Sequence, residues 1–354
     1  MTNIWDTLVI GGGQSGLAAG YHLQRRGLQY LILEANEKVT GSWPHQYDSL
    51  KLFSPARFSS LPDMNFPVDP NKYPLKDEVV RYLQLYKEHY QLPVRTGELV
   101  NRVEKEGEVF KIQTKSGNTY LSKTVIHATG NFSKPYIPVI KDHETFQGRT
   151  LHSSQYKNPS SFSGKRVIIV GRRNSAVQIG VELAEVSKTT LAVRQPVQLV
   201  NQKLLGQDVH FWVKVTGFDS FPFWRLGKTV PIPGGVTDLG DYQNRLDKGK
   251  PDQKPMFSSF YTNGVTWSDG AKEPVDSVIF ATGYRPNLNY LKIDGALNSK
   301  GIPLQVAGIS TGVSGMYYVG LEGQRSFSSA TLRGVGPDAK FVVRKALRYL
   351  KSLK

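Results

Sequence analysis

A glycine-rich turn near the start of the chain restricts the possible folds more than any other feature. The apolar run from residue 7 to 10 leads into Gly11, Gly13 and Gly16, and small residues that can begin a helix follow. In a strand–turn–helix unit, the first glycine permits a sharp turn, the second lets backbone N–H groups approach a pyrophosphate, and the third lets the helix pack closely on its strand. The N-terminus of such a helix binds the anion. The pattern therefore predicts a dinucleotide-binding unit.

An acidic residue in the expected place strengthens this prediction. The apolar run from residue 30 to 33 ends in Glu34, about twenty residues after the turn, where a carboxylate can accept hydrogen bonds from a ribose diol. A later buried strand over residues 123–127 ends in Ala128-Thr129-Gly130, whose small residues suit close approach to a ligand.

The composition sets the class of protein. The chain has 354 residues, of which 39% are hydrophobic and 21% charged, which is typical of a folded protein with two domains. It has no cysteine, which excludes disulfides, cysteine-ligated metal sites and a redox-active dithiol. We predict no metal site.

A strong positive charge points to anionic partners. The balance of 45 basic and 29 acidic residues gives a net charge of +16, which favours nucleotides, nucleic acid or an acidic membrane surface. The basic residues are dispersed, and neither a zinc-finger spacing nor an RNA-recognition signature occurs, so we expect no nucleic-acid partner. Without a signal-peptide pattern we expect a cytoplasmic protein, with peripheral membrane contact as an alternative.

The glycine pattern occurs a second time in the middle of the chain. Residues 163–170 form a strand pattern that runs into Gly171, an amphipathic helix is expected over 174–187, and a strand follows over 190–193. The unit closes with Ala281-Thr282-Gly283 and Tyr284, which repeats the Ala-Thr-Gly ending of the first unit. Two nested copies of one scheme predict two nucleotides.

The second copy ends its second strand in Arg194, where a site for an unmodified ribose more often has an acid. An arginine can form paired hydrogen bonds with a 2′-phosphate, which favours NADPH over NADH. A solvated arginine at the end of a strand is the alternative interpretation.

Three further segments have more than one interpretation. Trp43, in the loop over 40–55, is either a wall of the cofactor site or an anchor of a surface loop. An aromatic insert over about 202–260 packs on itself, caps the substrate pocket or touches a membrane, in that order of preference. A helix over 338–354 covers a sheet with its cations solvated, or lies on anionic lipid.

Taken together, these motifs resemble the flavin-containing monooxygenase family, and most closely its single-chain bacterial members and the plant indole-pyruvate monooxygenases. The resemblance covers nearly the whole chain. It includes the Gly-Ser-Trp at residues 41–43, the Tyr-x-x-Leu-Lys-Leu at 47–52, the identifying sequence at 146–156 with His152, and the closing segment over 320–338, which contains Arg333. We expect His152 by itself to be structural.

The resemblance implies an α/β fold with two nested Rossmann-like dinucleotide-binding domains. The FAD domain would comprise residues 1–155 and 286–354, and the inserted NADP domain residues 156–285. The residues expected at the FAD are Gly11, Gly13, Gln14, Ser15, Gly16, Glu34, Ala35, Ser42, Trp43, Ala128, Thr129, Gly130 and Gly320. Those expected at the NADP are Gly171, Asn174, Ser175, Ala176, Arg194, Ala281, Thr282, Gly283 and Tyr284.

The chemistry implied by the resemblance is that of an NADPH-dependent monooxygenase. Hydride passes from NADPH to FAD, the reduced flavin forms a C4a-hydroperoxide with O2, and a small organic substrate receives one oxygen atom at a nitrogen, a sulfur or a carbonyl carbon. This chemistry needs no acid–base pair, so we assign no catalytic residue. Substrate identity and oligomeric state stay open.

Two residues depart from the family pattern. Arg173 stands where the second unit would have its middle glycine, so it either turns outward and binds phosphate or obstructs the nucleotide. Phe53 stands where many members have an asparagine, which weakens inference about the substrate. The alternatives are an NADPH oxidase or reductase without oxygen insertion, and a non-enzymatic flavoprotein that acts on a membrane transport partner.

Overall fold

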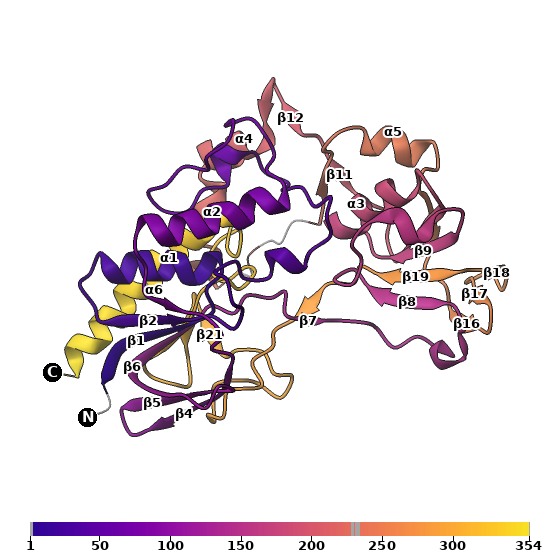
Figure 1. The fold of residues 1–354 in the computed structure, drawn as a ribbon. Coiled ribbons are helices and arrows are strands. Elements are labelled where there is room, and N and C mark those ends of the chain that lie inside the picture. The colour runs from indigo at the N-terminus through magenta and orange to yellow at the C-terminus, as the bar shows by residue number, and fades with distance from the viewer. Residues whose placement is uncertain (1–2, 228–229, 231–233, 354) are drawn as a thin grey trace.

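The computed structural model describes residues 3–227, 230 and 234–353. Figure 1 shows two lobes joined by strands near the middle of the molecule. Each lobe contains one large sheet, and helices pack against it. The α/β fold with two Rossmann-like units is therefore confirmed.

The first lobe contains a nine-stranded sheet with a parallel centre in the order β23-β6-β1-β2-β3. Its apolar strands alternate between the two faces: Val9 packs toward the helices, whereas Leu8 and Ile10 pack toward the opposite layer. The strands are β1 Ile4–Ile10, β2 Tyr30–Leu33, β3 Val94–Arg95, β4 Val100–Glu106, β5 Val109–Thr114, β6 Thr119–His127, β21 Gln305–Val306, β22 Ile309–Ser310 and β23 Met316–Tyr318.

Three helices cover one face of this sheet, namely α1 Gln14–Gln24, α2 Lys76–His89 and α6 Leu332–Ser352. After α2 the chain forms a meander, in which β4, β5 and β6 pair antiparallel in succession. Helix α6 begins six residues before the predicted start, and Pro337 lies in its first two turns. Its four predicted cations, Lys340, Arg344, Arg348 and Lys351, are exposed, while Phe341 is buried on the inner face.

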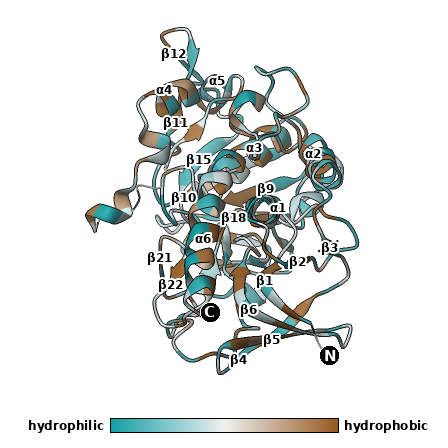
Figure 2. Cartoon of the chain, turned by 90° about the vertical axis from the view of Figure 1, so that its left-hand side faces the viewer, coloured by the Kyte–Doolittle hydropathy of each residue, from teal (hydrophilic) through white to brown (hydrophobic). Residues whose placement is uncertain are grey.

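The second lobe contains a five-stranded parallel sheet in the order β8-β19-β9-β10-β15. This is the same arrangement as β23-β6-β1-β2-β3, which shows that the sequence repeat is also a structural repeat. Figure 2 colours strand β9 as hydrophobic. The strands are β8 Arg149–His152, β9 Arg166–Val170, β10 Lys188–Val193, β15 Asp252–Pro255 and β19 Ser277–Phe280, and the helices are α3 Asn174–Leu183 and α5 Tyr242–Asp247.

The crossing between the lobes differs from the predicted boundary at residue 155. Strand β8 pairs with β19 in the second sheet, so it does not belong to the first domain, to which the sequence analysis assigned it. The chain crosses instead where β7 Lys134–Pro135 pairs with β20 Tyr284–Arg285. The returning strand of this crossing ends at Arg285.

A small antiparallel sheet covers the other face of the second lobe; its strands are β16 Ser259–Tyr261, β17 Gly264–Thr266 and β18 Lys272–Pro274. Glu273 joins it to the five-stranded sheet, because its carboxylate accepts hydrogen bonds from Arg166 Nε at 2.8 Å and from Lys254 Nζ at 2.9 Å. The same carboxylate accepts a bond from Trp267 Nε1 at 2.8 Å. This side chain is 19% exposed.

We expect the Glu273 cluster to make folding stability depend on acid pH. Burial raises the pKa of this carboxyl, but the hydrogen bonds from Arg166, Lys254 and Trp267 outweigh it and lower the pKa to about 2. The stabilisation is therefore complete above the unfolded pKa near 4.3 and declines as the pH falls toward about 2. Glu273→Gln should cost about 2 kcal/mol at pH 7 and less at pH 3, as measured by urea unfolding at both pH values.

The matched control for this prediction is Glu104, whose carboxylate pairs with Arg102 on an exposed strand edge. Glu104→Gln should leave the unfolding free energy unchanged, because exposed pairs contribute little. An equal loss at pH 7 and pH 3 in Glu273→Gln would contradict the proposed pH dependence.

The aromatic insert extends from the second lobe and lies over the first. It contains β11 Leu199–Val200, β12 Lys203–Leu204, β13 Gln207–Asp208, α4 Val209–Val215 and β14 Val236–Thr237, with 3-10 helices η5 Phe218–Ser220 and η6 Phe223–Leu226. Residues 228–229 and 231–233 of the predicted insert lie outside the described part. Among the helices that the structure describes, none combines the length and the apolar content needed to cross a bilayer.

Candidate functional site: two glycine turns and the insert over them

The first glycine turn is packed too closely to accept side chains at two of its glycines. Gly11 has φ +106°, and a Cβ there would lie 2.6 Å from the carbonyl oxygen of Ala128. A Cβ on Gly16 would lie 1.8 Å from the carbonyl oxygen of Gly11. Gly13 differs, because its Cβ would meet only Gly41 Cα, at 3.4 Å. The turn is therefore tight toward the strand and open at the residue that precedes helix α1.

Glu34 lies at the edge of this turn, and its side chain is buried. Oε2 accepts a hydrogen bond from the N–H of Gly12 at 2.6 Å, and Oε1 accepts one from the N–H of Asn36 at 2.9 Å. The carboxylate thus holds the turn in shape from the end of β2. The neighbouring Ala35 is exposed.

Ser42 and Trp43 lie next to the start of α1, and a short series of hydrogen bonds connects Trp43 to this helix. Trp43 Nε1 donates to Gln14 Oε1 at 2.7 Å, and Gln14 Nε2 donates to the carbonyl oxygen of Ala330 at 3.2 Å. Ser42 precedes the 3-10 helix η1, Trp43–His45, that carries the tryptophan. The chain links α1 to the residues just before α6.

The Ala128-Thr129-Gly130 ending and Gly320 complete the first cluster. Gly320 follows β23, and a Cβ there would lie 2.1 Å from Ser15 Oγ, so this strand end also needs a glycine. His127, just before Ala128, is buried, and its Nδ1 lies 3.1 Å from Tyr290 Oη. Burial lowers the pKa of His127 to about 3, so this residue is neutral near pH 7.

The second glycine turn repeats the first in detail. Gly171 has φ +142°, and a Cβ there would lie 2.5 Å from the carbonyl oxygen of Ala281, the counterpart of Ala128. The strand registers agree as well, since Ile10 pairs with His127 in the first sheet and Val170 with Phe280 in the second. Each turn therefore faces an Ala-Thr-Gly strand end.

The remaining predicted residues of the second site gather around this turn. Asn174 and Ser175 begin α3, Ala176 is buried against the turn, and Thr282 donates from its hydroxyl to the carbonyl oxygen of Tyr136. Tyr284 stacks edge-on against His152 at 4.9 Å.

His152, from the identifying sequence at residues 146–156, is bonded to neighbouring protein groups through both ring nitrogens. Its Nε2 lies 2.9 Å from the carbonyl oxygen of Gly283, and its Nδ1 lies 3.0 Å from Ser154 Oγ. Burial lowers its pKa, which favours the neutral ring. The histidine thus fixes the strand end that follows β19.

Arginines surround the second turn, where the first turn has glycines and an acid. Arg172 and Arg173 occupy the positions of Gly12 and Gly13, and Arg194 follows β10 as Glu34 follows β2. Arg194 is exposed, and Arg172 Nη1 is buried without an acceptor among the described residues.

Arg173 does not distort the turn. Its backbone has φ −96° and ψ −174°, close to the −76° and −170° of Gly13. Its side chain is 60% exposed and extends to the first lobe, where Nη1 lies 3.6 Å from Glu322 Oε1. The arginine therefore leaves the backbone of the turn as it is in the first copy.

The insert supplies two polar groups that the sequence analysis did not identify. Asp208 caps α4 and accepts a hydrogen bond from the backbone N–H of His210 at 2.8 Å, while His210 Nδ1 lies 2.8 Å from the same oxygen. Burial raises the pKa of Asp208, but bonds from His210 and Tyr73 outweigh it and hold the pKa below its usual value. The His210 ring stacks against Phe53 at 6.1 Å.

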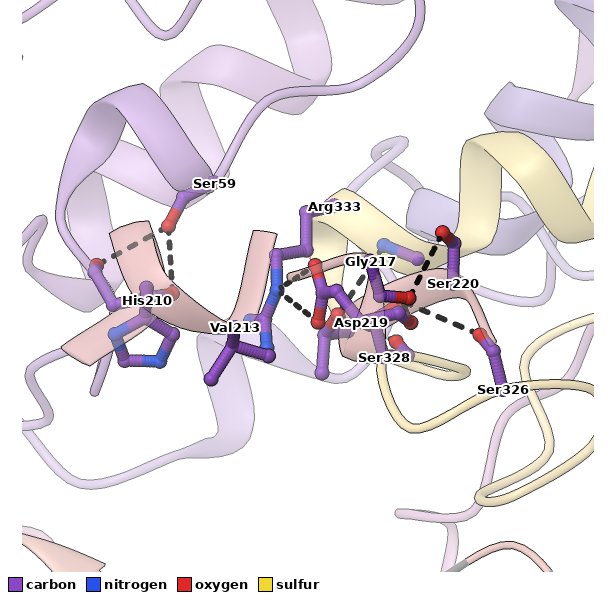
Figure 3. A network of polar contacts seen from close by, with 12 residues as sticks. Ser59, His210, Val213, Gly217, Asp219, Ser220, Ser326, Ser328 and Arg333 are labelled. Atoms are coloured by element: carbon purple, nitrogen blue, oxygen red, sulfur yellow. Dashed lines mark hydrogen bonds and ion pairs between the residues drawn. The ribbon is translucent and has the colours of Figure 1, made fainter. Parts of the chain in front are cut away.

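The second group is an ion pair between Asp219 of the insert and Arg333 of α6 (Figure 3). Aromatic contacts accompany it, because Phe218 packs on Phe327 and Trp224 packs on Phe341. The insert aromatics also pack on one another, as Phe218 and Phe223 do at 5.5 Å. The expected self-packing of the insert is thus present, and the insert also contacts α6 of the first lobe. No spacing in the sequence indicated the ion pair.

Known proteins match this architecture over the whole chain. The model of the pyridine nucleotide-disulphide oxidoreductase family matches residues 8–216. An uncharacterized CzcO-like oxidoreductase of Geobacillus kaustophilus is 34% identical over 350 residues, which are 99% of this chain and 100% of that protein. An indole-3-pyruvate monooxygenase of Oryza sativa subsp. japonica is 28% identical and covers 100% of this chain and 90% of its own length.

A solved structure gives the same result. A flavin-containing monooxygenase from Stenotrophomonas maltophilia superposes with a TM-score of 0.87 at 33% identity, covering 98% of this chain and 99% of that one. The fold and its two turns define a flavin-dependent oxidoreductase with two dinucleotide-binding domains. Within that class, the chain belongs to the flavin monooxygenase family.

Proposed function

We propose that this chain binds FAD at the first glycine turn and NADPH at the second, and oxygenates a small organic substrate with O2. The observation that carries the proposal is the structural repeat. Gly11 and Gly171 each face the carbonyl oxygen of an Ala-Thr-Gly strand end, in sheets with the same strand order. One chain therefore has two equivalent places for a dinucleotide.

The residues of the first turn fit FAD. The first N–H groups of α1 have no acceptor within their own helix, and the open side at Gly13 leaves room for a pyrophosphate beside them. Glu34 would hold the ribose from the end of β2, and Gln14 and Trp43, which are hydrogen-bonded to each other at the start of α1, would supply further contacts. When bound, FAD would supply the transfer of two electrons from NADPH to O2. One oxygen atom of O2 would go to the substrate and the other to water.

The chain itself must position both nucleotides and keep water away from the reaction. Reduced oxygen species are lost as hydrogen peroxide when water reaches them, so a covered site favours oxygenation. The insert supports this role, since Asp219 and Trp224 hold it against α6 of the first lobe. We assign no residue a proton-transfer step.

The arginines of the second turn support NADPH as the reductant. Arg194 stands at the strand end where the first copy has Glu34, and Arg172 has a buried guanidinium nitrogen without an acceptor among the described residues. Phosphate oxygens are strong acceptors for guanidinium groups.

Arg173 gives a separate test of nucleotide binding. We expect Glu322→Gln to tighten NADPH binding about threefold, because it frees Arg173 from an exposed ion pair of about 0.2–1 kcal/mol. The measurement is the NADPH dissociation constant from fluorescence titration of the oxidised protein. In an Arg173→Gly background the same change should have no effect, and a threefold gain that persists there would contradict the role of the pair.

The central experiment is anaerobic mixing of the FAD-loaded protein with NADPH, followed by oxygenated buffer. Flavin absorbance reports reduction and reoxidation, and peroxide and product assays report where the electrons go. We expect bleaching by NADPH and, with a suitable substrate, product in proportion to NADPH consumed. Peroxide alone with every substrate would favour an oxidase, and no bleaching would leave a different reductant or the non-enzymatic alternative.

A further inference from the structure

The contact between the insert and α6 contains an arginine with an unusual hydrogen-bonding pattern. Arg333 lies in the first turn of α6, and its Nε donates to both carboxylate oxygens of Asp219, at 2.8 and 3.1 Å. Ser328 Oγ donates to the backbone carbonyl oxygen of Asp219 at 2.8 Å, which fixes the aspartate in place. Figure 3 shows the Arg333 side chain reaching from α6 to the insert, where dashed lines join it to Asp219.

The guanidinium has a donor that the protein does not use. Nη1 of Arg333 is buried and has no acceptor among the described residues. The side chain as a whole is 11% exposed. A buried charged donor without a partner costs at least about 1–3 kcal/mol, so such groups call for an explanation. An acceptor from a bound ligand would remove this cost.

The position of Arg333 connects it to the flavin site. The carbonyl oxygen of Ala330, three residues earlier, accepts a hydrogen bond from Gln14, the first residue of α1. Gln14 Oε1 in turn accepts a hydrogen bond from Trp43 Nε1. Thr331 caps α6, and the first turn of this helix contains no acidic residue. The helix N-terminus and the guanidinium therefore both favour a negatively charged group at this place.

We propose that Arg333 binds the carboxylate of an organic acid substrate, an inference that rests on the proposed oxygenase function. Asp219 holds the Nε side of the guanidinium, which leaves the Nη edge for the ligand. The planar guanidinium fork matches two carboxylate oxygens. A carbonyl oxygen of the cofactor has the same acceptor chemistry, so the test must separate the two sources.

The test measures ligand binding to oxidised, FAD-loaded full-length protein without NADPH. Phenylacetate is the probe, phenylacetamide is its neutral match, and the flavin difference spectrum gives both dissociation constants. We expect Arg333→Met to weaken phenylacetate about 10- to 100-fold and to leave phenylacetamide unchanged, because a hydrogen bond to a charged group contributes about 1.5–3 kcal/mol. Arg333→Lys should recover part of the loss.

Asp219→Asn gives the decisive comparison. It removes the negative charge that neutralises Arg333 and that repels the carboxylate of phenylacetate. This repulsion is worth about 1 kcal/mol, so we expect phenylacetate to bind about fivefold more tightly. A purely structural ion pair predicts the opposite, with both variants weaker. Arg344→Met is the control, because Arg344 is an exposed cation on the same helix, and it should change neither constant.

Three results would overturn the proposal. The first is weaker phenylacetate binding in Asp219→Asn. The second is wild-type protein that binds acid and amide equally well. The third is an Arg333→Met protein that loses FAD affinity but keeps its preference for the acid, which would assign the acceptor to the cofactor. FAD retention and reduction by NADPH, measured on the same wild-type preparation, show separately whether the oxygenase function holds.

Discussion

Gly16→Ala is expected to yield protein without bound FAD. The added methyl group would lie 1.8 Å from the carbonyl oxygen of Gly11, and backbone atoms at that distance cannot be displaced without moving α1 away from β1. Overpacking of this kind costs about 3 kcal/mol. If the helix N-terminus moves to relieve it and the binding free energy falls by the same amount, dinucleotide binding weakens about 100-fold. The measurement is the ratio of flavin to protein absorbance after purification, followed by titration with FAD.

The structural repeat supplies the control for this prediction. Ala176 stands in the second copy at the position of Gly16, so a methyl group is already accommodated there. Ala176→Gly should keep the FAD content of the wild type, since the first turn is untouched. If Gly16→Ala retains FAD at full affinity, the close packing of α1 on its strand is not what forms the site.

Much of the fold was predictable because its signals are local. The glycines of both turns, the apolar strands that precede them and the two Ala-Thr-Gly endings each lie within a few residues of one another. From them follow the two nested units and the positions of α1 and α3. Glu34 and Arg194 could be placed for the same reason, because each directly follows the second strand of its unit.

The errors and omissions concern contacts between distant parts of the chain. Strand β8 has four residues and no glycine turn of its own, so nothing local indicated that it pairs with β19, more than a hundred residues later. The Asp219–Arg333 ion pair joins residues 114 positions apart, and Asp208 reaches Tyr73 across 135 positions. Spacing rules for helices and strands do not extend to such separations.

The arginines of the second turn show how sequence and structure complement each other. The sequence left open whether Arg173 obstructs the turn, because a residue type does not determine the direction of its side chain. The structure gives Arg173 the extended backbone of Gly13 and a side chain directed to Glu322. Arg194 remains the residue at the strand end where the two copies differ in charge, and it carries the prediction for nucleotide choice.

Arg194→Ala is expected to raise the NADPH dissociation constant about 10- to 100-fold and to leave that for NADH unchanged. The reason is that the two cofactors differ only in the 2′-phosphate, and a charge-assisted hydrogen bond to a phosphate contributes about 1.5–3 kcal/mol. Lys188→Ala is the matched control, since it removes the same charge at the other end of β10. Fluorescence titration gives the dissociation constants of both nucleotides. Equal losses of affinity for NADPH and NADH in Arg194→Ala would mean that this arginine contacts the part that the two nucleotides share. Selectivity for the 2′-phosphate would then lie with Arg172.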